Sequence, residues 1–282
     1  MRRVRRPYPV PLLLALASAA TFAPARAQDD RELGWTDKAE LTLVFTGGNA
    51  SQSTFGLKNA LDYVWPDAAF RFAAGGIRTE ATTFARTATG TADDFTVTET
   101  STSTVTAESY FARGRYDRNV GAQMFLYGGS GWERNTFAGV QSRYSFVGGA
   151  GRTFAERERF KLRADVGLTY TMQDDVVAGP RDSFAGARLT YDLFRGLTAS
   201  TDFGSTLILD ENLEATEDLR ADFTNWISVA IADGLALKTS LQVLFDNQPA
   251  LTEIPLGTTG TTVLTPLDEV DTVFTLAVVL TF

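Results

Sequence analysis

The chemistry open to this chain is that of carboxylates, hydroxyls and basic side chains, because the sequence contains no histidine and no cysteine. A Ser/His/Asp or Cys/His triad, a histidine general base and the commonest catalytic zinc sites all need a residue type that is missing. Disulfides and thiol chemistry are excluded for the same reason. No acid pair can be placed for a carboxylate-only reaction. We therefore expect neither an enzyme nor a cofactor.

Two short segments resemble binding motifs. The glycine-rich "GGAGRT" (148–153) lacks the Lys-Ser/Thr ending of a phosphate-binding loop and opens no helix. Gly148, Gly149 and Gly151 are better explained by a bend in a curved sheet, or by interior side chains packed against bare backbone. The acidic "DENLEATED" (210–218) offers carboxylates that Ca²⁺ favours, but solvated charge in a loop is the simpler interpretation. We predict no metal site.

The elements that would position the charged residues show apolar and polar residues in alternation with a period of two. In "RFKLRADVGLTY" (159–170), residues of one parity are charged, glycine or threonine, and the other parity is apolar or aromatic throughout. This pattern is typical of a strand with one apolar face. It recurs along the whole chain and predicts about twelve strands: 38–46, 52–65, 68–83, 103–116, 120–134, 138–154, 159–173, 183–194, 197–209, 219–231, 235–247 and 270–282.

The predicted connections alternate between short and longer ones. The short turns are "PDA" (66–68), "DRN" (117–119), "AERE" (155–158), "FRG" (194–196) and "ADG" (232–234). The longer connections are 84–102, 174–182, 210–218 and 248–269, with two compact exceptions at "GGNAS" and "NTFAG". Outer-membrane barrels have this asymmetry, with tight periplasmic turns, longer outer loops and an even number of strands.

The first 27 residues are typical of a secretory signal peptide, with a basic start, an apolar stretch and a small-residue cleavage pattern at Ala25-Arg26-Ala27. Cleavage there leaves 21 of the 26 basic residues against all 34 acidic ones, a net charge of −13. So acidic a chain is a poor candidate for nucleic-acid binding. No linker composition divides residues 28–282, which we expect to form one unit.

A secreted antiparallel sandwich would also alternate, and it remains the alternative to a membrane barrel. Many predicted strands reach the roughly 9 to 11 residues that cross a bilayer at a tilt. Several aromatic residues lie near strand ends, as in membrane barrels. The apolar ending must pair with another strand, and "KAELTLVFT" near the start is its expected partner. We predict an all-β fold, a transmembrane antiparallel up-and-down β-barrel of about twelve strands, in the outer membrane of a Gram-negative bacterium.

In such a barrel the charged residues of the polar parity would face the lumen. They would either line a solute path or pair across strands and fill the interior, since twelve strands lie between filled and open barrels. The expected lumen-facing residues are Lys58, Asp62, Arg71, Arg143, Lys161, Arg163, Asp165, Arg188, Asp192, Asp202, Asp222 and Lys238.

Three segments resemble a known family. They are "GWTDKAELTLVFTGGNAS" (34–51), "VGGAGRTFAERERFKLRADVGLTY" (147–170) and the ending "PLDEVDTVFTLAVVLTF". They are similar to the YdiY-like family of salt-induced outer membrane proteins. The resemblance implies an outer-membrane β-barrel without an established biochemical role. Membrane lipids and lipopolysaccharide are the partners that we expect for a barrel in that membrane.

The chain ending also looks like the assembly signal of bacterial barrels, which the outer-membrane insertion machinery reads. The residues that would form this signal are Phe274, Leu276, Val278, Leu280 and Phe282. The function expected from sequence is a small passive channel linked to envelope or salt stress. The alternative is a structural or lipid-interacting barrel that conducts nothing.

Overall fold

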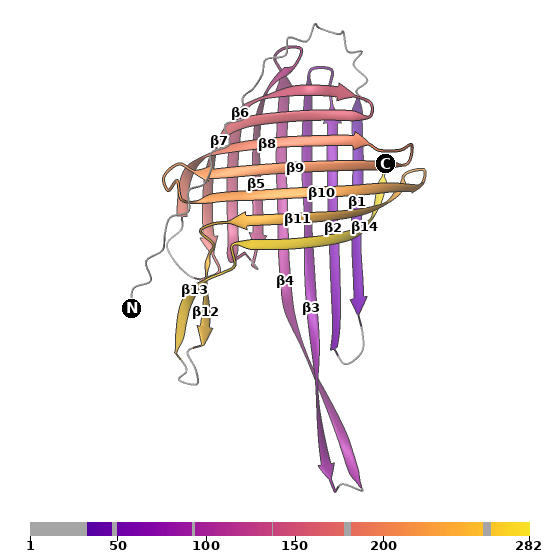
Figure 1. The fold of residues 1–282 in the computed structure, drawn as a ribbon, viewed down its shortest axis with the longest axis vertical. Coiled ribbons are helices and arrows are strands. Elements are labelled where there is room, and N and C mark those ends of the chain that lie inside the picture. The colour runs from indigo at the N-terminus through magenta and orange to yellow at the C-terminus, as the bar shows by residue number, and fades with distance from the viewer. Residues whose placement is uncertain (1–32, 47–49, 92–93, 137, 178–181, 256–260) are drawn as a thin grey trace.

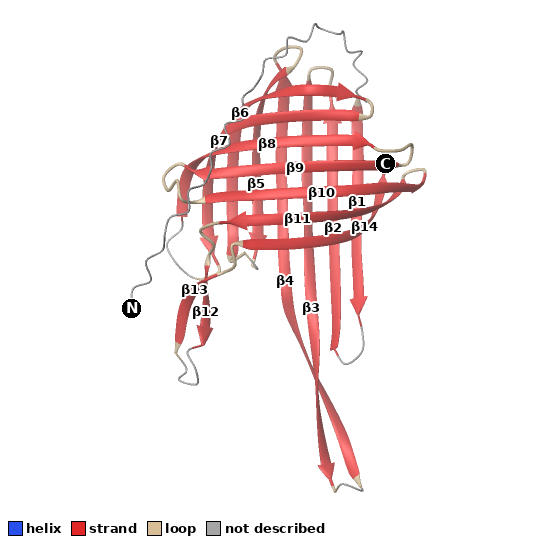
Figure 2. Ribbon diagram, in the orientation of Figure 1, coloured by secondary structure: helices blue, strands red, loops and turns tan. Residues whose placement is uncertain are grey.

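The computed structural model describes residues 33–46, 50–91, 94–136, 138–177, 182–255 and 261–282. Twelve antiparallel strands close into a barrel in the order β1-β14-β11-β10-β9-β8-β7-β6-β5-β4-β3-β2 (Figures 1 and 2). The fold and the strand number predicted from alternation are therefore confirmed. The barrel strands are β1 (Gly34–Thr46), β2 (Ala50–Val64), β3 (Ala68–Gly90), β4 (Phe95–Asn119), β5 (Met124–Asn135), β6 (Val140–Arg157), β7 (Phe160–Asp175), β8 (Asp182–Gly196), β9 (Thr201–Asn212), β10 (Leu219–Ala232), β11 (Leu235–Asp246) and β14 (Val270–Thr281).

The first and last barrel strands pair, as the apolar ending predicted, but their ladder is short. Lys38 to Leu41 of β1 pair with Val278 to Thr281 of β14. Asp37 and Phe282 add two backbone hydrogen bonds of 3.3 and 2.9 Å. By contrast, β1 pairs with β2 along its whole length. The β1–β14 seam is thus the shortest ladder of the closed barrel.

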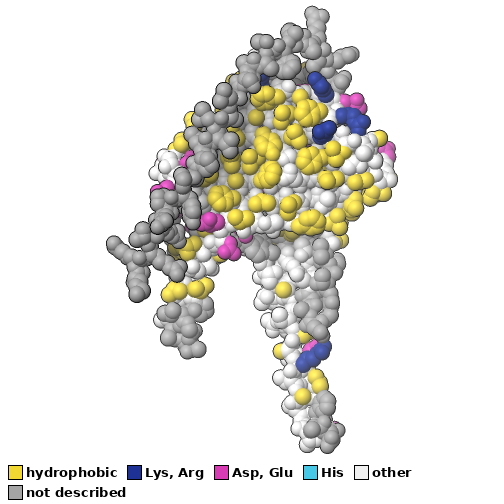
Figure 3. Space-filling view, in the orientation of Figure 1, with side chains coloured by type: hydrophobic (Ala, Val, Ile, Leu, Met, Phe, Trp, Pro, Cys, Tyr) yellow, Lys and Arg dark blue, Asp and Glu magenta, His cyan; other side chains and the backbone are white. Residues whose placement is uncertain are grey.

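The polarity of the barrel is the inverse of that of a soluble sheet. On β7, Val166, Leu168 and Tyr170 are 57%, 69% and 46% exposed, whereas Asp165 and Thr169 are only 5% and 7% exposed. Figure 3 shows hydrophobic side chains spread over the outer face of the front wall, with the charged side chains at its margins. A soluble sandwich would bury the apolar set instead. This outer surface is suited to lipid, and the charged residues at the alternate strand positions point into the barrel.

Aromatic side chains form a row near the end of the barrel that carries the short connections. Ring centroids lie 4.6 Å apart between Trp35 and Tyr63, 4.3 Å between Tyr63 and Trp65, and 6.3 Å between Trp65 and Tyr116. Trp35 is 64% exposed. Tyrosine and tryptophan at this level are expected where the hydrocarbon region meets water.

The predicted connection 84–102 is wrong, because most of it is strand. β3 and β4 remain paired out to Gly90 and Phe95 and form a two-stranded ribbon that projects well beyond the barrel (Figure 1). The β-branched threonines of this stretch favour extended backbone. The threonines lie on one face of the ribbon and the other face mixes apolar with charged side chains, so the regular apolar alternation that reveals the other strands is absent. At its other end β4 includes Asp117, which the sequence placed in a turn.

Two further differences concern the connections on the same side as the ribbon. The predicted loop 248–269 contains a separate hairpin, β12 (Leu251–Pro255) paired with β13 (Thr262–Pro266). β9 continues to Asn212, three residues beyond the predicted strand. The predicted signal peptide, residues 1–27, lies outside the described residues. Within the described ranges no helix is long and apolar enough to cross a membrane.

Candidate functional site in the barrel lumen

The interior of the barrel holds a cavity of about 630 Å³. Seven of the twelve residues predicted to face the lumen line it: Lys58, Asp62, Arg71, Arg143, Arg188, Asp192 and Asp222. Three others form interior ion pairs described below: Arg163, Asp165 and Lys238. Lys161 and Asp202 do not line the cavity and are the second residues of β7 and β9, near the short connections.

The charges that line the cavity are divided between the two halves of the barrel. On β2 to β6, five basic residues accompany two acidic ones: Lys58, Arg71, Arg113, Arg115 and Arg143, with Asp62 and Glu133. From β8 round to β14, two basic residues accompany nine acidic ones: Arg188 and Arg220, with Asp192, Asp210, Glu211, Asp218, Asp222, Asp246, Asp268, Glu269 and Asp271. The strand order places these halves opposite each other. The cavity therefore has a basic wall and an acidic wall.

A cluster of five ionic residues lies near the short connections, and we call it the Asp117 cluster. The Asp117 carboxylate accepts hydrogen bonds from Arg71 Nη1 (2.5 Å), Arg115 Nε (2.7 Å) and Arg163 Nη2 (2.9 Å). Arg115 also donates to Asp165, at 2.7 Å. Because β3, β4 and β7 all contribute, the cluster ties separate parts of the wall together inside the barrel.

Two aromatic side chains of β5 fill the space beside this cluster. Phe125 and Tyr127 are 1% and 5% exposed. The Arg163 guanidinium lies 4.2 Å from the Phe125 ring centroid, and that of Arg115 lies 3.8 Å from the Tyr127 centroid. The rings and the cluster together narrow the lumen on this side.

Bare backbone opposite β5 makes room for the two rings. A Cβ atom at Gly151 would collide with the Phe125 ring, and one at Gly149 would meet Tyr127 and the backbone of β7. These glycines belong to the "GGAGRT" segment. Of the two explanations given from sequence, the packing of interior side chains against glycine backbone is the one that applies to them.

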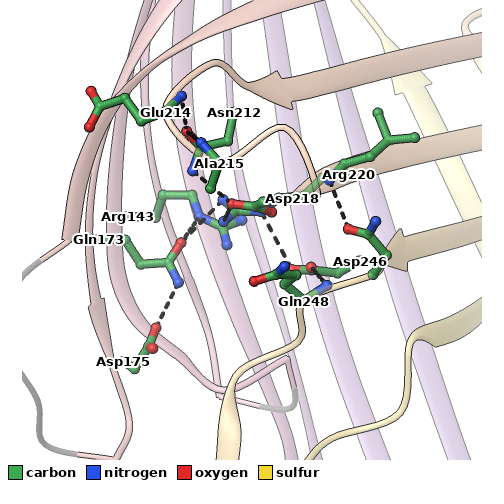
Figure 4. A network of polar contacts seen from close by, with 12 residues as sticks. Arg143, Gln173, Asp175, Asn212, Glu214, Ala215, Asp218, Arg220, Asp246 and Gln248 are labelled. Atoms are coloured by element: carbon green, nitrogen blue, oxygen red, sulfur yellow. Dashed lines mark hydrogen bonds and ion pairs between the residues drawn. The ribbon is translucent and has the colours of Figure 1, made fainter. Parts of the chain in front are cut away.

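A second polar network lies at the opposite end of the cavity, where the longer connections begin (Figure 4). Arg143 donates to Gln173 Oε1 at 2.7 Å and to Glu133 at 2.6 Å. Arg220 donates to Asp218 at 2.8 Å, and its Nε lies 3.5 Å from Asp246. This network joins β5, β6, β7, β10 and β11, so it fixes the outer rim of the cavity.

The acidic segment 210–218 is part of this lumen system. Asp210 belongs to β9 and accepts two hydrogen bonds from Arg188, of 2.7 and 2.8 Å. Asp218 is 6% exposed and accepts a hydrogen bond from Asn212. In the part of the chain that the structure describes, no three acidic residues come together in a way that could hold a metal ion.

A smaller group of charges lies on the inner face near the seam. Lys238 of β11 donates to Glu40 of β1 at 2.6 Å, and Lys58 lies 3.7 Å from the same carboxylate. Lys238 also lies 5.2 Å from the centroid of the Trp226 ring. This ion pair spans β14 and connects β1 to β11 inside the barrel.

Sequence reasoning omitted several charged residues that the structure places inside. They are Arg113, Arg115, Asp117, Glu133, Asp210, Arg220 and Asp246. A signal was available for three of them, because Arg113, Arg115 and Asp117 recur at every second position of β4 and so share one face. Asp210 and Asp117 were missed because they were assigned to connections.

The residues predicted to form an assembly signal lie together on the outer face. Phe274, Leu276, Val278, Leu280 and Phe282 are 71%, 52%, 42%, 43% and 77% exposed. Between them, Ala277 and Val279 are only 3% and 8% exposed. The large apolar side chains of the alternating ending therefore point outward, along the seam between β14 and β1.

Comparison with solved structures finds other barrels at low similarity. The NanC porin gives a TM-score of 0.45 at 8% identity, covering 88% of this chain and 98% of that one. The translocator domain of the autotransporter NalP from Neisseria meningitidis gives 0.41 at 12%, with 90% of each chain covered. The anion-selective porin from Comamonas acidovorans gives 0.38 at 11%, covering 89% and 100%. These likenesses are too remote to assign a function.

The location follows from the barrel itself. Lipid offers no partner to backbone N–H and C=O groups, so strands cross a membrane only as closed barrels, and the outer membrane of bacteria is where such barrels reside. A closed antiparallel barrel with an apolar outer surface and charges inside is accordingly an outer-membrane protein.

The remaining comparisons concern the sequence. No curated protein matches the chain. A protein-family model matches residues 39–264, which is well over half of the chain and runs from within β1 through β11, leaving out β14. The chain belongs to the family described as protein of unknown function, DUF481.

Proposed function

We propose that this protein is a passive channel for small polar or charged solutes. The observation that carries the proposal is the cavity of about 630 Å³ inside the barrel, with its basic and acidic residues on opposite walls. Charged rings and walls of this kind set the selectivity of pores.

The division of charge suggests how a solute moves. Opposed basic and acidic walls produce a field across the lumen, which orients dipolar solutes and offers separate paths to anions and cations. Most of the lining charges are held by ion pairs such as Arg188 with Asp210, so the walls are preorganised. Selectivity between simple ions should then be weak, because both signs find a favourable wall.

A second candidate is a barrel that conducts nothing and serves a structural or lipid-interacting role. The Asp117 cluster and the aromatic pair beside it favour this candidate, because they fill part of the lumen with fixed contacts. Under this proposal the same contacts would stabilise the wall and leave no continuous aqueous path.

Several further expectations belong to the proposal. They include removal of residues 1–27 on export, recognition of the outward-facing ending by the insertion machinery, contact with lipopolysaccharide, the lack of an enzymatic role and a link to salt or envelope stress. The resemblance to the YdiY-like family supports the last of these. The exposed apolar parity of β14 supports the recognition of the ending.

Uptake into proteoliposomes tests the channel. Vesicles that contain the purified protein should swell in an isosmotic solution of a small neutral solute such as glycerol or arabinose, and swelling should slow steeply as the solute grows. Empty vesicles are the control. Swelling no faster than in empty vesicles for every solute would overturn the proposal and favour the structural barrel.

A further inference from the structure

Arg113 differs from the other basic residues that line the cavity. Each of the other six is held in an ion pair, at distances from 2.5 Å for Arg71 with Asp117 to 3.7 Å for Lys58 with Glu40. Among the described residues, Arg113 forms no ion pair. Its guanidinium therefore keeps its hydrogen-bonding capacity available inside the barrel.

The acidic residue of the adjacent row is already engaged. Glu133 lies opposite Phe111, one step along the inner face from the Arg113–Gly131 pair. Its carboxylate accepts a hydrogen bond of 2.6 Å from Arg143. The ion pair of Glu133 is with Arg143, and none joins it to Arg113, so the Arg113 guanidinium keeps its donors for a ligand.

Small side chains lie beside Arg113 on the neighbouring strands of the inner face. The strand registers place Ala73 of β3 and Gly131 of β5 directly beside it, and Ser145 of β6 follows Gly131. Ala60 of β2 continues the same row beyond Ala73. All of these residues line the cavity. A row of alanine, glycine and serine takes up little volume, so the lumen is recessed beside the free guanidinium.

The ring of Phe111 helps to hold the Arg113 side chain. The guanidinium carbon lies 4.6 Å from the ring centroid, which is the range of a cation–π contact. Such a contact uses the face of the guanidinium and leaves its N–H edge available. The edge of a guanidinium matches the geometry of a carboxylate or phosphate, to which it donates two parallel hydrogen bonds.

We infer that Arg113 and the recess formed by Ala60, Ala73, Gly131 and Ser145 are a binding site for an oxyanion, the carboxylate or phosphate group of a small solute. The inference rests on the proposed function, because a solute that crosses the channel would bind transiently at this site on the basic wall. Ser145 would complete the site with a hydroxyl donor.

Titration calorimetry of the purified barrel in detergent tests the site without requiring conduction. The probes are citrate and inorganic phosphate, with glucose as the neutral control. Citrate, phosphate or both should bind, and Arg113→Gln should weaken that binding at least about tenfold, as the loss of a charged hydrogen bond implies. Arg113→Lys should retain part of it. Arg86→Gln is the matched control, because Arg86 pairs with Glu99 on the ribbon outside the barrel.

The outcomes separate this inference from the channel itself. Equal affinity in wild type and Arg113→Gln, or no binding of either anion to a wild-type barrel that is folded by heat-modifiability on gels, would overturn the site. Anion binding that is lost in Arg113→Gln supports the site even if the vesicles do not swell, in which case only the channel fails. Binding of one probe alone identifies which oxyanion the site takes.

Discussion

Asp117 shows how a single carboxylate organises the interior of this barrel. Its side chain is 4% exposed and accepts hydrogen bonds from three arginines. Arg115 lies on β4 like Asp117 itself, whereas Arg71 and Arg163 lie on β3 and β7. The three arginines are partly exposed to the lumen, at 40%, 24% and 22%. Three guanidinium groups held this close together repel one another, and the negative charge of the carboxylate between them offsets that repulsion.

Asp117→Asn should destabilise the barrel strongly. Removal of one partner from a buried ion pair leaves uncompensated charge and costs about 3 kcal/mol, and here three guanidiniums lose a partner together. The free energy of unfolding in urea, followed by the tryptophan fluorescence of the barrel in detergent, measures the effect.

Asp67→Asn is the control for that variant. Asp67 pairs with Arg118, and both side chains are more than half exposed, so its loss should leave the urea midpoint unchanged. Equal midpoints for wild type and Asp117→Asn would show that the cluster does not support the wall.

Sequence reasoning reached part of this site and missed the rest for a physical reason. The alternation along a strand places Arg71 and Arg188 on the polar face, because the face to which a side chain points depends only on its position in the strand. The partners of these residues depend on strand order and register, as the separation of 46 residues between Arg71 and Asp117 illustrates. The lack of an ion-pair partner for Arg113 depends on the positions of all the neighbouring charges, so no short sequence pattern indicates it.

At the scale of elements, the seam between β1 and β14 is the weakest ladder. It holds four residue pairs, whereas β11 pairs with the other edge of β14 along nearly its whole length. Leu43, whose backbone groups face β14 in this register, has no partner on that strand. Unpaired edges are costly in lipid, so we expect unfolding to begin here.

A covalent link across the seam should therefore stabilise the barrel. Asp37 and Phe282 exchange backbone hydrogen bonds, so the next pair, Lys38 with Thr281, is a closely spaced non-hydrogen-bonded pair that suits a disulfide. The chain has no native cysteine to interfere. The double variant Lys38→Cys with Thr281→Cys, when oxidised, should unfold about 5 to 10 °C higher than when reduced. Identical unfolding temperatures would mean that the barrel does not open first at the seam.

The ribbon of β3 and β4 is an element that the barrel does not require. Pairing of β3 with β2 ends at Thr83, and pairing of β4 with β5 begins at Ser109. An isolated two-stranded hairpin has little stability of its own. It was hidden from sequence reasoning because one of its faces carries threonines and the other mixes apolar with charged residues, whereas the strands found correctly alternate apolar with polar.

Shortening the ribbon should leave the barrel intact. Thr83 and Thr102 are directly opposite each other, so replacing residues 84–101 by Asn-Gly gives a two-residue hairpin turn in the existing register. The shortened protein should keep the unfolding temperature of the full chain within a few degrees and swell vesicles at the same rate. A loss of more than about 10 °C would show that the ribbon contributes to the stability of the barrel.

For the molecule as a whole, the sequence predicts the architecture far better than the state of the lumen. The alternation of apolar and polar residues along strands such as β7 decides which side chains meet lipid. Because the same alternation recurs in about twelve strands, it predicts a barrel. Whether an interior of this size holds water or side chains depends on packing between distant strands. Phe125 and Tyr127 enter the lumen only because Gly149 and Gly151 face them across the wall.

The most direct test of the central claim is the conductance of the purified protein in planar bilayers. A channel with this cavity should give discrete current steps that grow with salt concentration. The steps should be larger in Phe125→Ala, because that ring narrows the lumen beside the Asp117 cluster. Current steps no different from those of the protein-free bilayer at every salt concentration, for wild type and Phe125→Ala alike, would contradict the claim and leave the structural barrel.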